Sequence, residues 1–215
     1  MSKNILIVNF KTYEQSTGNK GLKLAKICEK VSLKTGKKIA IAVQATDLYL
    51  IKNNVKIDVY AQHIDYHNQG QSTGYITIES IKGCKGTLLN HSEHQIKEEI
   101  ISKTMLKIKE KKLKSVICAN NVKKGILLSK FKPDYIAIEP PELIGGNVSV
   151  SSSNPKLISD SVKKINCNVI VGAGINSAED VKIAVKLGAK GVLVASGVVK
   201  AKNQEKVLTD LVKYL

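Results

Sequence analysis

Glu139 is a residue suited to chemistry in an unusual setting, because it ends the apolar run YIAIE and is followed at once by Pro140 and Pro141. A carboxylate whose surroundings raise its pKa toward neutrality can act as a general base. The two prolines fix backbone φ angles and favour an extended conformation before them, so they would orient Glu139 beside a stiff hinge. The alternative interpretation is an ordinary carboxylate that ends a strand and points to solvent.

His91 ends another apolar run, TLLNH, and is the candidate electrophile. Ser92 and Gln95 resemble a capping box, which would begin a helix directly after it. The positive end of a helix macrodipole disfavours an imidazolium, so the ring would stay neutral and its N–H could polarise a carbonyl. The other histidines lack this placement, and we expect structural or surface roles for them: His63, His67 and His94.

Both residues end runs that belong to a repeating pattern. Eight short runs are apolar throughout rather than alternating, which is typical of strands buried on both faces. These runs cover residues 5–10, 39–43, 59–64, 87–91, 115–119, 135–139, 168–174 and 191–196. Helical patterns separate them, with predicted starts at Asn154 and Ser177 and a predicted stop at Gly36.

This alternation of strand and helix is compatible with a doubly wound open sheet or with a closed (β/α)8 barrel. The even spacing and the absence of a linker between two halves favour the barrel. We therefore expect an α/β fold in which residues 1–215 form a single domain, a closed eight-stranded parallel barrel. The active site of such a barrel lies at the C-terminal ends of its strands, where Asn9 and Lys11 would join Glu139 and His91.

The last two strand-to-helix turns contain the sequences VGAGI and VLVASG. In barrels of this kind the loops after strands seven and eight often bind phosphate through backbone N–H groups at a helix N-terminus. A G-x-G pattern alone is a weak signal, since glycine is common in tight turns. Its position in the seventh loop is what makes it informative here.

The formal net charge of +16 raises the possibility of a nucleic-acid-binding protein. However, all 34 basic residues are lysines, and the sequence contains no arginine to provide the bidentate fork that reads guanine. The lysines are also spread along helical faces, and the common nucleic-acid-binding signatures are absent. A lysine-rich surface that draws small anionic substrates inward is therefore the favoured interpretation.

Other classes are disfavoured by composition. No apolar run approaches the roughly 20 residues that a membrane span needs, and residues 1–11 read as a first strand rather than a signal peptide. We expect a cytoplasmic protein. The cysteines are far apart with no C-x-x-C pair, which argues against a metal site and a disulfide framework. We expect most of them to be small buried hydrophobic residues: Cys28, Cys84, Cys118 and Cys167.

Three motifs in order, NFKTY (9–13), LLNHSEH (88–94) and IEPPELIG (138–145), resemble the triosephosphate isomerase family, in particular its shorter archaeal branch. The resemblance runs over essentially the whole chain. It implies an isomerase of glycolysis and gluconeogenesis that interconverts dihydroxyacetone phosphate and D-glyceraldehyde 3-phosphate through an enediolate, with no cofactor. It also suggests a homotetramer in which the loop 67–74 reaches a neighbouring subunit.

The same resemblance assigns roles to individual residues. Glu139 would be the general base and His91 the electrophile, and this family is itself the standard case of such a pair beneath a closing loop. Lys11 would place its ammonium near the phosphate and the developing oxyanion, Asn9 would donate a hydrogen bond beside it, and Glu93 would orient Lys11. Segment 143–148 would be the lid. The phosphate would be bound by Ile144, Gly145, Gly174, Ala195 and Ser196 in addition to Asn9 and Lys11.

Two other hypotheses remain open at this point. Another phosphate-binding barrel, such as a thiamine-phosphate or indole-glycerol-phosphate synthase, would share the loops after strands seven and eight. Asn9-x-Lys11 on the first strand with Glu139 on the sixth separates the isomerase from these enzymes. A lysine-rich nucleic-acid-binding protein, from a different class, would lose its binding steeply with salt.

Overall fold

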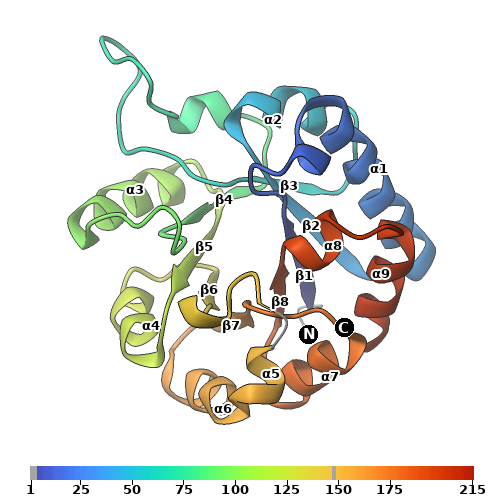
Figure 1. Cartoon of the computed structure of the whole chain (residues 1–215). Helices are drawn as coiled ribbons and strands as arrows, with labels where there is room; N and C mark the ends of the chain where they lie inside the picture. Colours follow the sequence, from blue (N-terminus) through green and yellow to red (C-terminus); the bar gives the residue numbers. More distant parts are fainter. Residues whose placement is uncertain (1–3, 147–148) are drawn as a thin grey trace.

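In the computed structural model, which describes residues 4–146 and 149–215, eight parallel strands form a closed barrel in chain order (Figure 1). The strands are β1 (Ile5–Asn9), β2 (Lys38–Val43), β3 (Asp58–Ala61), β4 (Gly86–Leu89), β5 (Lys114–Ala119), β6 (Tyr135–Ile138), β7 (Asn168–Val171) and β8 (Gly191–Val194). The first and last strands pair in parallel, with Ile5 opposite Gly191, and this pairing closes the barrel. The expected eight-stranded parallel barrel is therefore confirmed.

Helices form a ring around the strands (Figure 1). The longer helices are α1 (Gly18–Thr35), α2 (Ala45–Lys52), α3 (Glu98–Glu110), α4 (Val122–Ser129), α6 (Pro155–Lys164), α7 (Ala178–Lys186) and α9 (Gln204–Leu211). The short ones are α5 (Val150–Ser153) and α8 (Ser196–Val199), with 3-10 turns η1 (Glu14–Ser16), η2 (Ile78–Ile81), η3 (Pro141–Leu143) and η4 (Val212–Tyr214). The predicted starts at Asn154 and Ser177 are confirmed, because each side chain accepts a hydrogen bond from a backbone N–H of the first turn. The predicted stop at Gly36 is confirmed as well.

The expected start of a helix directly after His91 is wrong, because α3 begins only at Glu98. The chain first makes a turn in which the His94 N–H donates to the His91 carbonyl (2.8 Å). The Asn90 side chain then accepts a hydrogen bond from the Ile96 N–H (3.1 Å). Ser92 and Gln95 therefore do not form a capping box.

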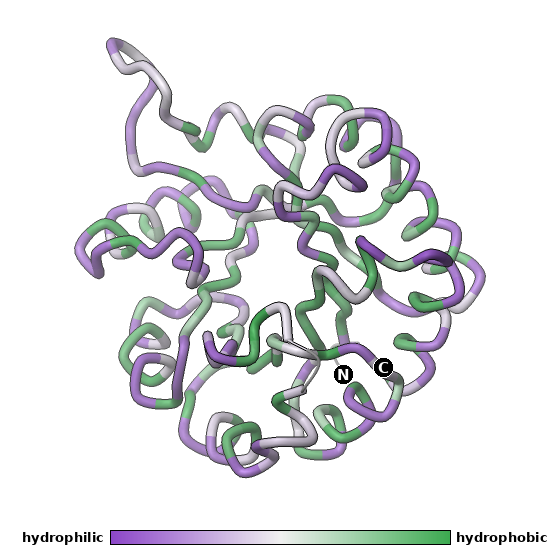
Figure 2. The backbone as a smooth tube through the Cα atoms, in the orientation of Figure 1, coloured by the Kyte–Doolittle hydropathy of each residue, from purple (hydrophilic) through white to green (hydrophobic). Residues whose placement is uncertain are grey.

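The strands bury one set of side chains inside the barrel and another set against the helices. Ile7 of β1 and Ala137 of β6 belong to the inner cluster, whereas Val8 packs in the layer between strands and helices. Figure 2 shows the barrel strands as predominantly hydrophobic. Since side chains alternate along a strand, the next inward positions toward the C-terminal ends are Asn9 and Glu139. The alternation thus places these two polar residues at the mouth of the barrel.

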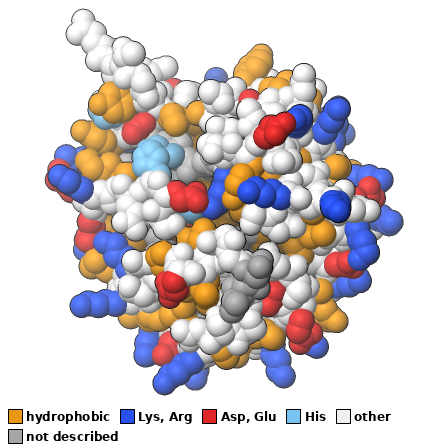
Figure 3. Space-filling model, viewed as in Figure 1, with side chains coloured by type: hydrophobic (Ala, Val, Ile, Leu, Met, Phe, Trp, Pro, Cys, Tyr) orange, Lys and Arg blue, Asp and Glu red, His pale blue; other side chains and the backbone are white. Residues whose placement is uncertain are grey.

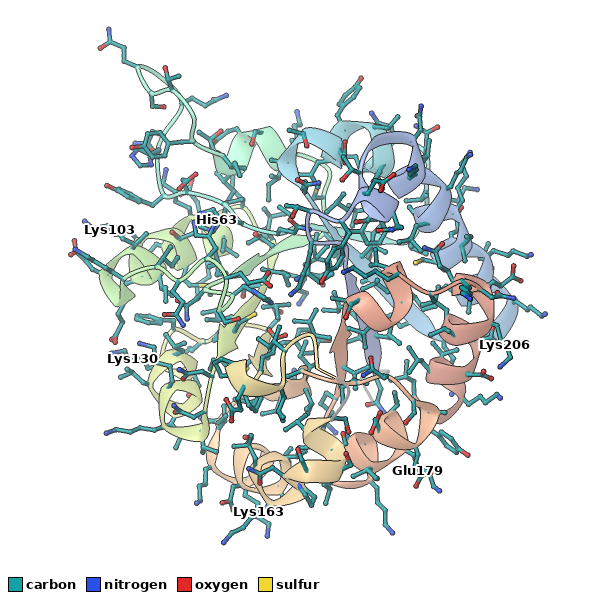
Figure 4. All side chains as sticks on the ribbon, in the orientation of Figure 1. His63, Lys103, Lys130, Lys163, Glu179 and Lys206 are labelled. Atoms are coloured by element: carbon teal, nitrogen blue, oxygen red, sulfur yellow. The ribbon has the colours of Figure 1, made fainter. Side chains whose placement is uncertain are left out.

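On the face of the molecule seen in Figure 3, the lysines are distributed rather than gathered in one patch. Figure 3 shows basic side chains around the periphery of this face, interspersed with acidic ones. Lys103, Lys130, Lys163 and Lys206 point outward from the helix ring (Figure 4). This arrangement agrees with the lysine-rich surface expected from the sequence.

Two further expectations concern membrane segments and cysteines. None of the helices in residues 4–146 and 149–215 combines the length and apolar character needed to cross a bilayer.

Cys28, Cys84 and Cys118 are buried and Cys167 is partly buried, all as free thiols. The expectation that most cysteines are small buried hydrophobic residues is confirmed.

Barrel closure depends on a glycine, and this gives a stability prediction. A Cβ at Gly191 would lie 1.9 Å from the carbonyl oxygen of Ile5 on the neighbouring strand, and the φ angle of Gly191 is +146°. We expect Gly191→Ala to lower the free energy of unfolding by more than about 3 kcal/mol, because the clash is with backbone that cannot move aside. Urea unfolding followed by circular dichroism measures the change.

Gly70 provides the matched control for this substitution. Its φ angle is +142°, similar to that of Gly191, but nothing lies within 4 Å of a Cβ built there. Gly70→Ala therefore reports backbone strain without the clash. Equal destabilisation in the two variants would contradict the importance of close packing between β1 and β8.

Candidate active site

One cavity at the C-terminal mouth of the barrel brings together residues that are far apart in the sequence. With the exception of Glu93, every predicted site residue lines it: Asn9, Lys11, His91, Glu139, Ile144, Gly145, Gly174, Ala195 and Ser196. These residues come from the end of β1 and from the loops after β4, β6, β7 and β8. Glu93 lies beside the cavity, in contact with Lys11.

Glu139 follows the last residue of β6 and is held by a backbone hydrogen bond from its N–H to the Ala119 carbonyl (3.0 Å). The residue is only 6% exposed, and within the described part of the chain its Oε2 has no hydrogen-bond partner. Burial raises the pKa of Glu139, while His91, the Cys118 thiol and Lys11 act more weakly in the opposite direction. A buried carboxylate with a raised pKa is suited to proton abstraction near neutral pH.

His91 faces this carboxylate, with 3.6 Å between its Nε2 and the Glu139 Oε2. Its other ring nitrogen, Nδ1, accepts a hydrogen bond from the Glu93 backbone N–H (3.2 Å). A ring nitrogen that accepts a hydrogen bond carries no proton, so the proton of the ring lies on Nε2. The tight turn after His91 thus fixes the tautomer. The helix N-terminus that was expected to keep the ring neutral does not directly follow His91, since α3 begins only at Glu98.

Lys11 is fixed in place by contacts at both its backbone and its side chain. Its φ angle of +47° is unusual for a residue with a side chain, and its N–H donates to the Asn9 Oδ1 (3.0 Å). Gln62 donates to the Lys11 carbonyl (3.1 Å). The Lys11 Nζ lies 2.6 Å from the Glu93 Oε1, with the lysine side chain 11% exposed and the glutamate 56%. The amine therefore reaches the cavity while its counterion lies toward solvent.

The segment predicted to form the lid, residues 143–148, follows the two prolines of the predicted hinge. Pro140 leads into the turn η3, and Gly145 has a φ angle of +75°. Ile144, Gly145 and Gly146 contribute to the cavity wall. The remainder of the expected lid, positions 147 and 148, lies outside the described residues.

Residues before and within the first turn of α7 contact the chain on both sides of positions 147 and 148. The Asn176 Nδ2 donates to the Gly146 carbonyl (3.3 Å). Asp180 accepts hydrogen bonds from the Ser149 hydroxyl and from the backbone N–H groups of Asn176 (3.1 Å) and Ser177 (2.9 Å). Sequence reasoning identified Ser177 and Asp180 only as a helix start and did not select Asn176, because an asparagine before a helix is common and gives no signal of a contact with the lid.

The remaining histidines lie outside this cavity. His63 stacks on His94 with 4.2 Å between ring centroids, and His67 stacks on Tyr75 at 3.5 Å. His63 lies on the inner side of the helix ring, unlike the outward-pointing labelled lysines (Figure 4). Burial lowers the pKa of His63, and the charge of the nearby His94 lowers it further.

Across residues 4–146 and 149–215, no group of three His, Cys, Asp or Glu side chains is arranged to hold a metal ion.

Comparison with known proteins gives one consistent result. The family model described as "Triosephosphate isomerase" matches residues 4–215. The chain is 49% identical to the triosephosphate isomerase of Methanocaldococcus jannaschii over 218 residues, covering 98% of this chain and 100% of the relative. It is 46% identical to that of Methanothermus fervidus, with 99% of each covered, and 45% identical to that of Metallosphaera sedula, with 99% of this chain and 96% of the relative covered.

Proposed function

Because this chain belongs to the triosephosphate isomerase family, we propose that its cavity interconverts dihydroxyacetone phosphate and D-glyceraldehyde 3-phosphate by proton transfer through an enediolate. The observation that carries this proposal is the pairing of a buried Glu139 with a His91 whose Nε2 holds the ring proton, 3.6 Å apart. Neither a thiamine-phosphate or indole-glycerol-phosphate synthase nor a nucleic-acid-binding protein is favoured by the family match.

In this proposal Glu139 takes a proton from the carbon next to the carbonyl of dihydroxyacetone phosphate. The His91 Nε2–H polarises that carbonyl, and His91 then moves a proton between the two oxygens of the enediolate. Glu139 returns its proton to the neighbouring carbon, so the reaction is an isomerisation without net gain or loss of atoms. Lys11 and Asn9 stabilise the oxyanion as it develops, in a site where low exposure to water strengthens their electrostatic effect. Glu93 orients Lys11.

The phosphate group would lie against the loops after β7 and β8, within reach of Asn9 and Lys11, which line the same cavity. We propose that Gly174, Ala195 and Ser196 bind it through backbone or hydroxyl groups, and that Ile144 and Gly145 cover it as parts of the lid. The shared lining of one cavity by all five residues supports this assignment. A closed lid would exclude water from the enediolate and hold back elimination of phosphate.

We further propose that the enzyme serves glycolysis and gluconeogenesis in the cytoplasm, needs no cofactor, works as a single domain over residues 1–215, and belongs to the archaeal branch of the family. We also propose a homotetramer in which the loop 67–74 contacts a neighbouring subunit. This loop lies in the segment that projects from the barrel between β3 and η2 (Figure 1), and a projecting loop is available for such contacts. Sedimentation equilibrium measures the assembled mass.

The activity is tested by the turnover of D-glyceraldehyde 3-phosphate by the purified protein, coupled to a dehydrogenase that consumes dihydroxyacetone phosphate. We expect rapid turnover with no added metal and no cofactor other than the reduced nicotinamide that the coupling dehydrogenase consumes. Folded protein without turnover would overturn the isomerase proposal and direct attention to other phosphate-binding barrels.

The raised pKa of Glu139 predicts a pH dependence. Because the base acts only when ionised, we expect kcat/KM to fall as the pH drops through this raised pKa of the free enzyme, at a higher pH than for an ordinary glutamate. The difference between potentiometric titrations of the wild type and of Glu139→Gln gives the pKa directly, without interference from ionisation of the substrate. Titration of the group at an ordinary glutamate value would contradict the prediction.

A further inference from the structure

We propose that Gly172 is a positioning residue for the base, because the absence of a side chain at this position creates the space in which the Glu139 side chain lies. The inference deepens the proposed isomerase function and rests on it. Gly172 is the first residue after β7, and sequence reasoning considered the glycines of VGAGI only as candidates for phosphate binding.

Strand pairing makes Gly172 the neighbour of Glu139. In the ladder between β6 and β7, Ala137 lies opposite Ile170 and Ile138 lies opposite Val171. The pairing continues one step further, since the Gly172 N–H donates to the Ile138 carbonyl (2.9 Å). Ala137 and Ile170 belong to the inner cluster, so two residues further along the strands both Glu139 and Gly172 lie on the inward side.

The atoms nearest to the space beside Gly172 belong to the base. A Cβ at this position would lie 2.6 Å from the Glu139 Cγ, 2.6 Å from its Oε1 and 2.9 Å from its Cδ. These are the three nearest atoms, and all belong to one side chain. Gly172 is not among the glycines with a positive φ angle, so its backbone alone does not require glycine. The steric fit of Glu139 is therefore the specific reason for glycine here.

An alanine at this position would displace the carboxylate rather than unfold the barrel. The clashing atoms belong to the outer part of a side chain that can rotate, whereas the backbone of β7 could remain in place. A displacement of about 1 Å in a catalytic group can cost on the order of 100-fold in rate. We therefore expect Gly172→Ala to lower kcat by about 10- to 100-fold, with little change in KM.

Gly125→Ala is the matched control. A Cβ there would lie 2.5 Å from the Ile165 Cδ1 and 3.1 Å from the Ile138 Cδ1, so it would also clash with the ends of rotatable side chains. Both isoleucines pack in the layer between strands and helices, and Gly125 lies on α4 outside the cavity. We expect this variant to retain the wild-type kcat. The inhibition constant of glycerol 3-phosphate, a phosphorylated three-carbon compound that cannot isomerise, should be unchanged in both variants, because it reports on the phosphate site.

The decisive experiment combines these kinetic measurements with difference titration of Gly172→Ala against the double variant Gly172→Ala/Glu139→Gln. A reduced kcat, an unchanged inhibition constant and a shifted Glu139 titration would support the positioning role. Wild-type kcat in Gly172→Ala would overturn it, as would a parallel loss of glycerol 3-phosphate binding, which indicates general damage to the site. If the folded wild type itself shows no turnover, the proposed function fails, and the titration alone decides whether Gly172 positions Glu139.

Discussion

Replacement of Glu139 by glutamine is expected to lower kcat by roughly 1,000- to 10,000-fold, because an amide of nearly the same shape cannot accept the proton. The carboxylate is buried and close to His91, so no other described carboxylate in the cavity is available to replace it. Steady-state turnover of D-glyceraldehyde 3-phosphate measures the loss. Glu179→Gln is the control, since Glu179 is exposed on α7 and outside the cavity (Figure 4).

Stability distinguishes a lost base from a damaged fold in this variant. At a pH between the ordinary and the raised pKa, the Glu139 carboxyl group is protonated in the folded protein and ionised in the unfolded chain. Ionisation of Glu139 therefore lowers stability as the pH rises through this window. We expect Glu139→Gln to be at least as stable as the wild type above the window, by urea unfolding. Full activity in a folded Glu139→Gln variant would exclude Glu139 as the base.

Replacement of Lys11 by methionine is expected to lower kcat/KM by about 100- to 1,000-fold or more, because it removes a cation from a site that handles a dianionic substrate and an oxyanion. The unpaired carboxylate of Glu93 would add to the loss of kcat/KM. Glu93 would lose its partner at 2.6 Å while its Oε2 stays 3.6 Å from the His91 Nδ1. An unpaired negative charge would then remain beside the entrance to a site that binds an anion.

Lys206→Met is the matched control for this second variant. Lys206 also pairs with a carboxylate, that of Asp210 at 2.8 Å, but its side chain is 72% exposed on α9. We expect wild-type kcat/KM in this control, since exposed ion pairs contribute little. An unchanged kcat/KM in Lys11→Met would remove Lys11 from the site.

The fold could be predicted because its strands carry a local signal. Each strand buried on both faces appears as an apolar run, and all eight predicted runs overlap a strand of the barrel. The predicted ends were less accurate: β7 ends at Val171, whereas the predicted run continued to residue 174. The loop after β7 begins with the small nonpolar residues 172–174, so composition alone does not show where pairing with the neighbouring strands ends.

The site was predictable where a residue has a distinctive local setting. Glu139 stands before two prolines, and His91 and Lys11 belong to recognisable motifs. The capping box predicted after His91 is wrong, because the chain there forms a turn in which the Asn90 side chain accepts a hydrogen bond from the Ile96 N–H. A hydrogen bond between residues six positions apart has no sequence signature. The contact of Asn176 with the lid also depends on two segments meeting in space.

The pairing of β1 with β8 has a consequence for how the molecule is made. Because a polypeptide is synthesised from its N-terminus, Ile5 to Val8 of β1 are made long before their partners in β8, Gly191 to Val194. During that time β1 keeps one unpaired edge, which is a template for association with other chains. The barrel therefore cannot close before β8 has been synthesised, and the growing chain depends on rapid capture of that strand by β1.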